Sequence, residues 1–558
     1  MVLKYLFYLL GGALLLMVAN RYVALSSNVA DLGFFLNNLA NIDTQLPLAY
    51  SGHFQPLMII WGVGFQALPS GISPLVLVEL QVLALFGSVL AIWRVFGSWP
   101  GVAMLLYYPL WANALFDFHF DHLTVPLLAA FFISCERRRV GWATLAAATL
   151  VLVKELFALQ TVACGLYFGW LAFHLRGSGV SVRLVVLGAS LTLWGSGWFY
   201  GATHWLMPYF GDNSPSTLQS GAFSWLGSSL SEMVWTLVSR PDRVLTEIFS
   251  SPGKLVYLGV VIGLLAFLPL LRPAALIVAL PLLMIAMLSR LDNYYGYANH
   301  YTAGVIVPAV VAFRDGLPIA SGYFASLITW IMSKIERSRL PIPIPININI
   351  NINIPIFSTW KKFFSMTVLN ERKIFSIVLF AWLIVGHWAL ASSPISRLFW
   401  SDKVWSYSWR AYVPTAREVM MKKAMLQYIP ADSDVSVTTQ NTVNWYHLAH
   451  RKVYLPFPLG VHSPHMVMDW SNRDLPGLWQ YVLTGAMTPT ITHARYADYV
   501  VLDLKRPWFI IEKGCDWLYG ACRNDEMATK FLRLVNETRQ RYSTVFERDG
   551  FMILRRKQ

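Results

Sequence analysis

Long hydrophobic runs separated by short polar segments make up most of the chain as far as about residue 393. A helix needs about 20 apolar residues to cross a bilayer, and shorter runs are common where helices end at a recessed polar cavity. The pattern predicts an all-α polytopic membrane bundle of about eleven transmembrane helices. The runs lie at about 4–24, 73–96, 100–115, 123–135, 141–153, 156–175, 184–206, 255–271, 273–289, 300–313 and 374–392.

Two further apolar segments have a less regular pattern. Residues 54–69 are broken by Gly and Pro, which favours an interfacial or re-entrant segment. Residues 317–335 fit a span and an interfacial helix equally well. Neither is counted among the predicted spans.

The pattern changes after the last run. Residues 394–558 alternate between short helical and strand-like segments, which predicts a small α/β domain with a partly parallel sheet. Helices are expected at 417–428, 442–450 and 525–540, strands at 434–439, 452–455 and 498–504, and a terminal hairpin at Asp549-Gly550. No Gly-rich phosphate loop follows any of these strands, so nucleotide binding is not predicted.

A segment of low complexity precedes the last run. Residues 341–356 repeat Pro-Ile and then Asn-Ile, and the prolines exclude a helix. We therefore divide the chain into four parts. They are a transmembrane domain (1–335), a basic cytoplasmic linker (336–372), a last transmembrane helix (373–393) and an extracytoplasmic domain (394–558).

Composition narrows the class of protein. Of the 558 residues, 56% are hydrophobic and 13% charged, whereas soluble domains are about a quarter charged. The chain is therefore predicted to be an integral membrane protein. The net charge of +14 does not indicate nucleic-acid binding, because the sequence holds no basic helix or aromatic-basic motif. Four cysteines are too few for a disulfide scaffold, although Cys515 and Cys522 could close a small loop in an oxidising compartment.

The distribution of Lys and Arg predicts the orientation. If the N-terminus is cytoplasmic and the spans alternate, the cytoplasmic loops hold most of the basic residues before the last run. This asymmetry predicts a multi-pass protein of the cell membrane with a cytoplasmic N-terminus and an extracytoplasmic C-terminal domain. The cytoplasmic group comprises Arg94, Arg137, Arg138, Arg139, Arg176, Arg183, Arg272, Arg314 and the stretch 334–373.

Four polar clusters lie at the ends of hydrophobic runs in the first third of the chain. Ionisable groups at membrane depth are costly unless they are paired or lie in a wet cavity. In the predicted topology all four clusters face the outer side, which predicts one polar site that opens there. They are Ala30-Asp31-Leu32-Gly33, Gly52-His53-Phe54-Gln55-Pro56, Asp117-Phe118-His119-Phe120-Asp121-His122 and Lys154-Glu155.

Asp31 and His53 each have a structural and a functional explanation. Asp is a favoured helix N-cap, and a His at the end of a loop is commonly a surface or capping residue. As functional groups, Asp31 would take a proton from a hydroxyl or bind a divalent cation. His53 would orient a phosphate, ligate a metal or shuttle a proton.

The segment from Asp117 to His122 is the densest constellation, with two acids and two imidazoles in six residues. On a helix, Asp117 and Asp121 would share one face, and His119 and His122 another. The alternative is a solvated turn whose charges mark the membrane boundary. A metal could also bind here, but the spacing fixes no set of ligands.

Lys154-Glu155 interrupts an apolar stretch. Either the two side chains neutralise each other, or Lys154 contacts a lipid phosphate while Glu155 holds it in place. Arg290, in a later polar segment, is a candidate phosphate clamp. The candidate catalytic residues are thus Asp31, His53, Asp117, His119 and Asp121, and the candidate substrate-binding residues are His122, Lys154, Glu155 and Arg290.

The order and spacing of these motifs resemble a family of prokaryotic predicted membrane proteins that is grouped with the GT-C superfamily of membrane glycosyltransferases. The resemblance runs through the four clusters and the late segment 497–503, and it covers most of residues 10–310 plus the terminal domain. Two positions depart from the family pattern. The family usually follows its third-motif His with Pro and Glu, where this chain has Phe120-Asp121, and it tends to have an acid where this chain has Leu156. The second departure removes a carboxylate.

The resemblance implies a GT-C-like fold and the transfer of a sugar from a polyprenyl-phosphate donor on the outer face of the membrane. The acceptor would be a glycan, a lipid or a protein. Asp31 would be the base or a metal-linked acid, and in the second case the cofactor would be a divalent metal ion. Two other classes stay open, a transporter or lipid flippase with a buried polar substrate site and a non-catalytic scaffold. A transporter is expected to show internal repeats, and none is found in the sequence.

Overall fold

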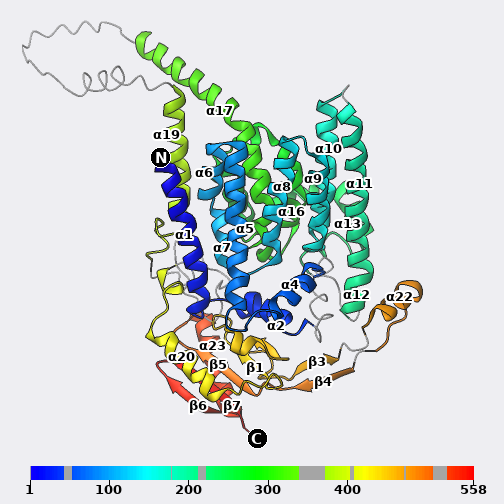
Figure 1. Ribbon diagram of the computed structural model, residues 1–558, viewed down its shortest axis with the longest axis vertical. Coiled ribbons are helices and arrows are strands. Elements are labelled where there is room, and N and C mark those ends of the chain that lie inside the picture. Colours follow the sequence, from blue (N-terminus) through cyan, green and yellow to red (C-terminus); the bar gives the residue numbers. More distant parts are fainter. Residues whose placement is uncertain are drawn as a thin grey trace, which may run out of the picture.

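A helical bundle and a small mixed domain, packed end to end, make up the molecule in the computed structural model (Figure 1). Helix α1 runs down the bundle toward the domain, α17 runs away from it, and α19 returns. The structure describes residues 2–42, 53–176, 179–211, 221–298, 300–337, 371–401, 408–469, 473–489, 491–506 and 525–557. The pair Cys515 and Cys522, the repeat at 341–356 and Gly52 lie outside the described residues.

The bundle consists of helices that differ widely in length. Among the described residues, five are long and apolar enough to cross a membrane, or six if the bent pair α14 and α15 is one span. The helices are α1 (Val2–Val23), α2 (Phe34–Ala40), α4 (Leu57–Gln66), α5 (Ser73–Phe96), α6 (Ser98–Leu106), α7 (Tyr108–Phe116), α8 (Thr124–Glu136), α9 (Val140–Thr149), α10 (Phe157–His174), α11 (Gly179–Gly201), α12 (Met207–Phe210), α13 (Leu230–Ser239), α14 (Pro241–Ile248), α15 (Pro252–Ile262), α16 (Leu276–Leu288), α17 (Ala303–Arg337) and α19 (Glu371–Leu390). Short turns of π- or 3-10 helix flank them, among them η1 (Val29–Gly33), η2 (Phe120–Leu123) and η9 (His300–Thr302).

Several predicted runs are broken, and others are joined. The run at 100–115 is divided into α6 and α7, with Pro109 in the first turn of α7. The runs at 300–313 and 317–335 instead form the single helix α17. A mostly helical membrane bundle followed by a small sheet domain is therefore confirmed, whereas the count of eleven spans stays a prediction.

Helices α2 and α4 lie at the end of the bundle, between it and the terminal domain (Figure 1). Helix α4 corresponds to the segment 54–69 that was predicted to be interfacial or re-entrant, and its ten residues are too few to cross a bilayer. This end of the bundle is also where η1 and η2 lie.

Helices α10 and α11 pack closely because glycines line their contact. A Cβ atom on Gly165 would lie 2.5 Å from the carbonyl oxygen of Gly188, and one on Gly195 would lie 2.5 Å from that of Ala158. Small residues allow helix backbones to approach in this way within membranes. The contact fixes α10, whose first turn follows Lys154-Glu155.

The C-terminal domain contains a five-stranded sheet in the order β2-β1-β5-β7-β6. Strand β1 is parallel to β2 and β5, and β7 is antiparallel to β5 and β6, so the predicted partly parallel sheet is confirmed. Its elements are α20 (Ala416–Tyr428), β1 (Val437–Thr439), α21 (Tyr446–Ala449), β2 (Tyr454–Pro456), β5 (Tyr499–Asp503), α23 (Asp525–Arg541), β6 (Tyr542–Arg548) and β7 (Phe551–Arg556). The helix predicted at 442–450 is shorter than expected, because residues 440–444 form a loop that contacts the bundle.

The sequence pattern missed an arm that extends sideways from this domain below α12 (Figure 1). It consists of β3 (His465–Asp469), α22 (Leu475–Thr484) and β4 (Ile491–Arg495), with β3 and β4 antiparallel. The Tyr209 hydroxyl of α12 donates a hydrogen bond of 2.9 Å to the carbonyl oxygen of Asp474. The arm thus contacts the bundle far from α1.

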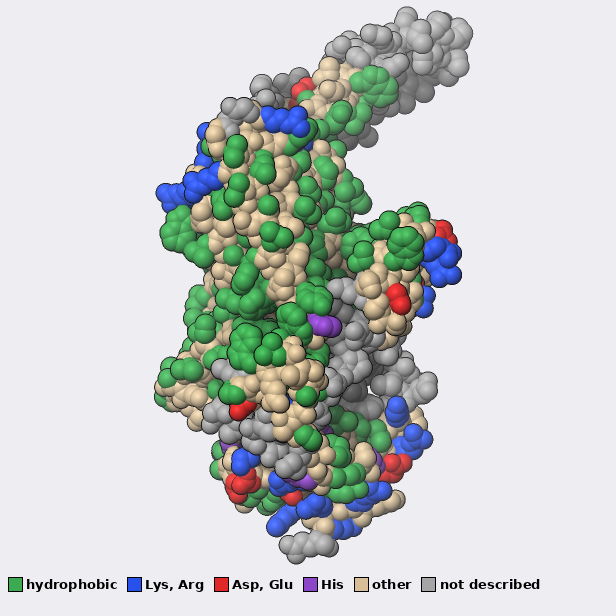
Figure 2. Space-filling model, turned by 90° about the vertical axis from the view of Figure 1, so that its right-hand side faces the viewer, with side chains coloured by type: hydrophobic (Ala, Val, Ile, Leu, Met, Phe, Trp, Pro, Cys, Tyr) green, Lys and Arg blue, Asp and Glu red, His purple; other side chains and the backbone are tan. Residues whose placement is uncertain are grey.

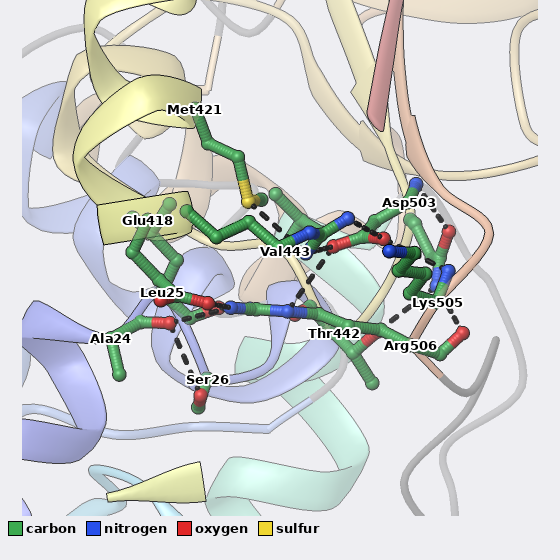
Figure 3. A network of polar contacts seen from close by, with 12 residues as sticks. Ala24, Leu25, Ser26, Glu418, Met421, Thr442, Val443, Asp503, Lys505 and Arg506 are labelled. Carbon is green, nitrogen blue, oxygen red and sulfur yellow. Dashed lines mark hydrogen bonds and ion pairs between the residues drawn. The ribbon is translucent and has the colours of Figure 1, made fainter. Parts of the chain in front are cut away.

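The domain is held to the bundle by buried polar contacts (Figure 3). Arg506 donates hydrogen bonds to the carbonyl oxygens of Ala24 (2.8 Å) and Leu25 (2.7 Å), which follow α1. Asn441 accepts two more in its backbone carbonyl and side-chain oxygen, from the N–H groups of Val29 and Ala30, both at 2.9 Å. The loop between α1 and α2 is therefore fixed by the C-terminal domain.

Basic side chains gather at the opposite end of the bundle. On the face shown in Figure 2, hydrophobic side chains cover the bundle between this basic zone and the charged terminal domain. Arg314 lies about 16 Å along α17 from Ala303, the residue that follows η9, and pairs with Glu136 at the end of α8. The arginines assigned to cytoplasmic loops thus include a group at the end remote from the polar clusters.

Candidate functional site

The polar clusters meet at the end of the bundle that faces the C-terminal domain. Each of the four contributes a side chain to one continuous group, although more than a hundred residues separate the first from the last. The joining contacts are Asp31 Oδ1 to His119 Nε2 (3.5 Å), Asp121 Oδ1 to Lys154 Nζ (3.4 Å) and Glu155 Oε1 to His53 Nδ1 (2.7 Å). The structure therefore brings together the residues that the sequence placed on one face of the membrane.

Asp31 lies in the turn η1, just beyond α1. Its Oδ2 accepts a hydrogen bond of 2.8 Å from the side-chain amide of Asn28. Burial raises the pKa of Asp31 to about 6, although the Asn28 hydrogen bond and the positive charge of Arg21 oppose the shift. The side chain is still 19% exposed, so a substrate could reach it. A carboxylate with such a pKa suits proton transfer near neutral pH.

His119 lies between Asp31 and a second imidazole. Its ring stacks on that of His300 with 3.7 Å between centroids and 15° between planes. Burial and the neighbouring His300 hold the pKa of His119 well below its usual value. His119 is thus a neutral ring at neutral pH. Its backbone N–H donates to Gln81 Oε1 at 3.1 Å, which fixes it against α5.

Asp117 points away from His119 and towards α1. Its Oδ1 accepts from Arg21 Nε at 3.2 Å and its Oδ2 from the Asn28 N–H at 2.8 Å. The expected shared helical face of Asp117 and Asp121 was wrong, because residues 117–119 are not helical and η2 starts only at Phe120. Asp117 therefore connects the third cluster to the end of the first span.

Lys154 and Glu155 also differ from the expectation, since they have separate partners. Lys154 is 2% exposed and pairs with Asp121. Glu155 accepts from His53 Nδ1 and, at 2.9 Å, from the backbone N–H of Phe54. Glu155 thus orients the second cluster, while Asp121 holds Lys154.

Several buried polar atoms in this group have no hydrogen-bond partner among the described residues. They are Nδ1 of His119, Oδ2 of Asp121, both ring nitrogens of His122 and Nδ1 of His300. Buried polar atoms are normally paired with protein, ligand or water, so this concentration is typical of a binding site. It places His122 at the site, with its ring centroid 6.0 Å from that of His119.

Arg290 lies in a different environment. Its Nε is 3.1 Å from Glu247 Oε2, and the same carboxylate contacts the buried Lys254 through Oε1 at 2.8 Å. The guanidinium also lies 5.5 Å from the ring of Trp225. The structure does not join Arg290 to the four clusters through the contacts of its described neighbours, and its role as a phosphate clamp stays a prediction.

Four residues at the site were absent from the sequence-based candidates. Arg21 and Asn28 fix Asp117 and Asp31, Gln81 fixes the backbone of the third cluster, and His300 stacks on His119. Gln81 carries a signal that could have found it, because it is polar inside an apolar run. His300 lies in the later polar segment, and only the packing of η9 against η2 reveals its neighbour.

The geometry gives little support to a metal-centred site. Among the residues that the structure describes, no three His, Cys, Asp or Glu side chains are placed to hold one metal ion. The carboxylates have other partners, since Asp117 pairs with Arg21, Asp121 with Lys154 and Glu155 with His53. What the group offers is one partly exposed carboxylate, the stacked imidazoles of His119 and His300, and one buried ammonium.

Comparison with known proteins places the chain in a family. The crystal structure of ArnT from Cupriavidus metallidurans in the apo state aligns with 14% sequence identity and a TM-score of 0.43, over 99% of this chain and 97% of that chain. No protein with a curated description matches the sequence. The model of the predicted membrane protein family DUF2079 matches residues 22–485, more than half of the sequence, and the chain therefore belongs to this family.

Proposed function

We propose that this multi-pass membrane protein is a glycosyltransferase that moves a sugar from a polyprenyl-phosphate donor to an acceptor hydroxyl on the outer face of the cell membrane. The observation that carries the proposal is the environment of Asp31. It is a partly exposed carboxylate with a raised pKa, next to a neutral imidazole, in the same polar group as the buried ammonium of Lys154. The motif order resembles a family that is grouped with the GT-C glycosyltransferases, and this supports the same interpretation.

The reaction needs one base and one source of positive charge. The acceptor hydroxyl attacks the anomeric carbon of the donor while Asp31 takes the hydroxyl proton. A carbon–oxygen bond forms, and the bond from the anomeric carbon to the phosphate oxygen breaks with its electron pair leaving on the polyprenyl phosphate. Lys154 supplies positive charge to the site where this phosphate gains negative charge.

The other residues of the group position Asp31 and Lys154. Asn28 and His119 hold the carboxylate of Asp31, and Asp121 holds Lys154. Glu155 fixes His53, which would then face the donor or acceptor as a hydrogen-bonding group. Pre-oriented groups of this kind lower the cost of reorganisation in the transition state.

Replacing Lys154 by Met should lower kcat/KM for the donor by about 10- to 100-fold, because a charge opposite the leaving phosphate is lost. The substitution also leaves Asp121 buried and unpaired, which destabilises the fold by itself. The double variant Lys154→Met/Asp121→Asn separates the two effects. Its thermal stability should recover towards that of the native protein while its activity stays low, and recovery of activity together with stability would mean that Lys154 is only structural.

Two measurements test the function itself. Mass spectrometry of the purified full-length protein should detect co-purified polyprenyl phosphate, and a transfer assay with a polyprenyl-phosphate sugar should show release of the carrier. If the folded and stable protein transfers no sugar from any of a panel of such donors, the proposal is contradicted.

The orientation is also testable. If the basic end of the bundle is cytoplasmic, the C-terminal domain and the polar group lie together outside. A reporter enzyme that is active only outside the cytoplasm should therefore be active when it is fused after Gln558. Activity of a cytoplasm-specific reporter at the same position would place the site on the inner face instead.

A further inference from the structure

A second polar feature lies at the end of the bundle remote from the proposed active site. The turn between α8 and α9 contains Arg137, Arg138 and Arg139, and Arg183 lies beside it at the start of α11. All four side chains are exposed, and no carboxylate pairs with any of them among the described residues. Four uncompensated charges at one turn repel one another, so an anion there would stabilise them.

Two grooves meet at this turn and share Arg139, Trp142 and Leu145. The first has a volume of about 430 Å³ and lies between α8 and α9. Its lining includes Leu127 and Ile133 along α8, and Arg137 and Arg139 from the turn that follows α8. The groove is therefore apolar along the helices and basic where the helices end.

The second groove, of about 580 Å³, surrounds the basic groups themselves. Arg138, Arg139 and Arg183 line it together with Trp142. The backbone of Arg138 is left-handed, with φ of 56°, as the tight turn between the helices requires. Both volumes lie within the range of about 300–1,000 Å³ that is typical of ligand sites.

Trp142 marks the depth of this feature in the membrane. It is 65% exposed in the described structure and lines both the basic groove and the apolar one. Exposed Trp residues are enriched where the hydrocarbon core meets the head groups. The arginines beyond Trp142 would thus lie at head-group level, and the apolar groove would lie in the hydrocarbon.

We propose that this turn is a binding site for an anionic phospholipid, with the lipid phosphate between Arg139 and Arg183 and one acyl chain along the groove between α8 and α9. Guanidinium groups bind phosphate oxygens in bidentate fashion, which suits several arginines around one head group. A free anion would use the arginines but not the apolar groove. A zwitterionic lipid would use the groove but would bring its own cation against the arginines.

Native mass spectrometry of the full-length protein in detergent tests the proposal without any activity assay. Titration with phosphatidylglycerol should give a bound lipid that phosphatidylcholine of the same chain length does not give. Arg139→Gln should weaken this binding about five-fold, and Arg139→Gln/Arg183→Gln about 25-fold, as expected for the loss of single charges near a lipid surface. Trp142→Ala should also weaken phosphatidylglycerol binding, because Trp142 lines both grooves.

Arg94→Gln is the matched control, because Arg94 is exposed in the last turn of α5 and lines neither groove. Its affinity for phosphatidylglycerol should equal that of the native protein. An equal loss in Arg94→Gln and Arg139→Gln would show general charge attraction and overturn the proposal, as would equal binding of the two lipids. Inorganic phosphate at millimolar concentration should not displace the lipid, and displacement would assign the site to a free anion.

Discussion

Replacing Asp31 by Asn should lower turnover by about two to four orders of magnitude, the usual contribution of a positioned general base. Asn keeps the shape of the side chain and can still accept from Asn28, but it cannot take a proton. The native enzyme should lose kcat/KM as the pH falls below about 6, because burial raises the pKa of Asp31 to that value and protonation removes the base. A transfer assay across pH 5–8 measures both effects.

The same substitution should not destabilise the protein at neutral pH. A folded-state pKa above the ordinary value of 3.8 means that the ionised carboxylate is disfavoured in the fold. The stability that a protonated Asp31 provides is complete below about pH 4 and is lost as the pH rises to about 6. An amide side chain does not ionise and would avoid this loss, so the melting temperature of Asp31→Asn at pH 7 should equal or exceed that of the native protein.

Asp292→Asn is a control for general effects of a lost carboxylate. Asp292 is exposed and bonds to Tyr295 outside the group of clusters. Its replacement should leave turnover within about two-fold of the native value, because its hydrogen bond to Tyr295 involves none of the four clusters. Full activity of Asp31→Asn would leave the enzyme without its base, and the transporter or scaffold class would then be favoured.

The sequence predicted which segments meet at the site but not how their side chains pair. When spans alternate in direction, the topology decides which of their ends lie on the same side of the membrane. The hydrophobic pattern and the Lys/Arg distribution placed Asp31, His119 and Lys154 on one side, so these residues could be grouped. Pairing depends on helix rotation and on the path of each loop, which no pattern in one sequence encodes. Lys154 and Glu155 accordingly find partners from two different clusters.

The broken helices show a similar limit. Hydropathy shows the length of an apolar run but not the point at which its helix breaks. The run at 100–115 was therefore predicted to be one span, although α6 and α7 are separate. Arg21 was not among the candidate residues, because its partner Asp117 is 96 residues away in the sequence. The five-stranded sheet of the C-terminal domain was predicted more closely than its arm, since short strands and a terminal hairpin are local patterns.

Replacing Arg506 by Met should destabilise the protein by about 3–5 kcal/mol, the usual effect of removing one partner from a buried ionic group. The guanidinium is 4% exposed and lies 2.7 Å from Glu418 and 3.3 Å from Asp503. It also donates to the backbone carbonyls of Ala24 and Leu25, as Figure 3 shows. Thermal unfolding and limited proteolysis of the purified chain should show early release of the C-terminal domain.

Lys505→Met provides the matched control, because Lys505 is the adjacent residue, carries the same charge and is 57% exposed in its pair with Asp549. Its effect on stability should stay within about 0.5 kcal/mol, as for other exposed ion pairs.

Replacing Arg506 should also lower the turnover of the enzyme. Asn441 of the domain holds the backbone of Val29 and Ala30, directly before Asp31. If Arg506 fixes the domain on the loop that carries Asp31, then Arg506→Met should lose turnover at a temperature at which the bundle is still folded, while Lys505→Met keeps it. A variant whose domain is released but whose turnover is native would show that the domain is not needed to position Asp31.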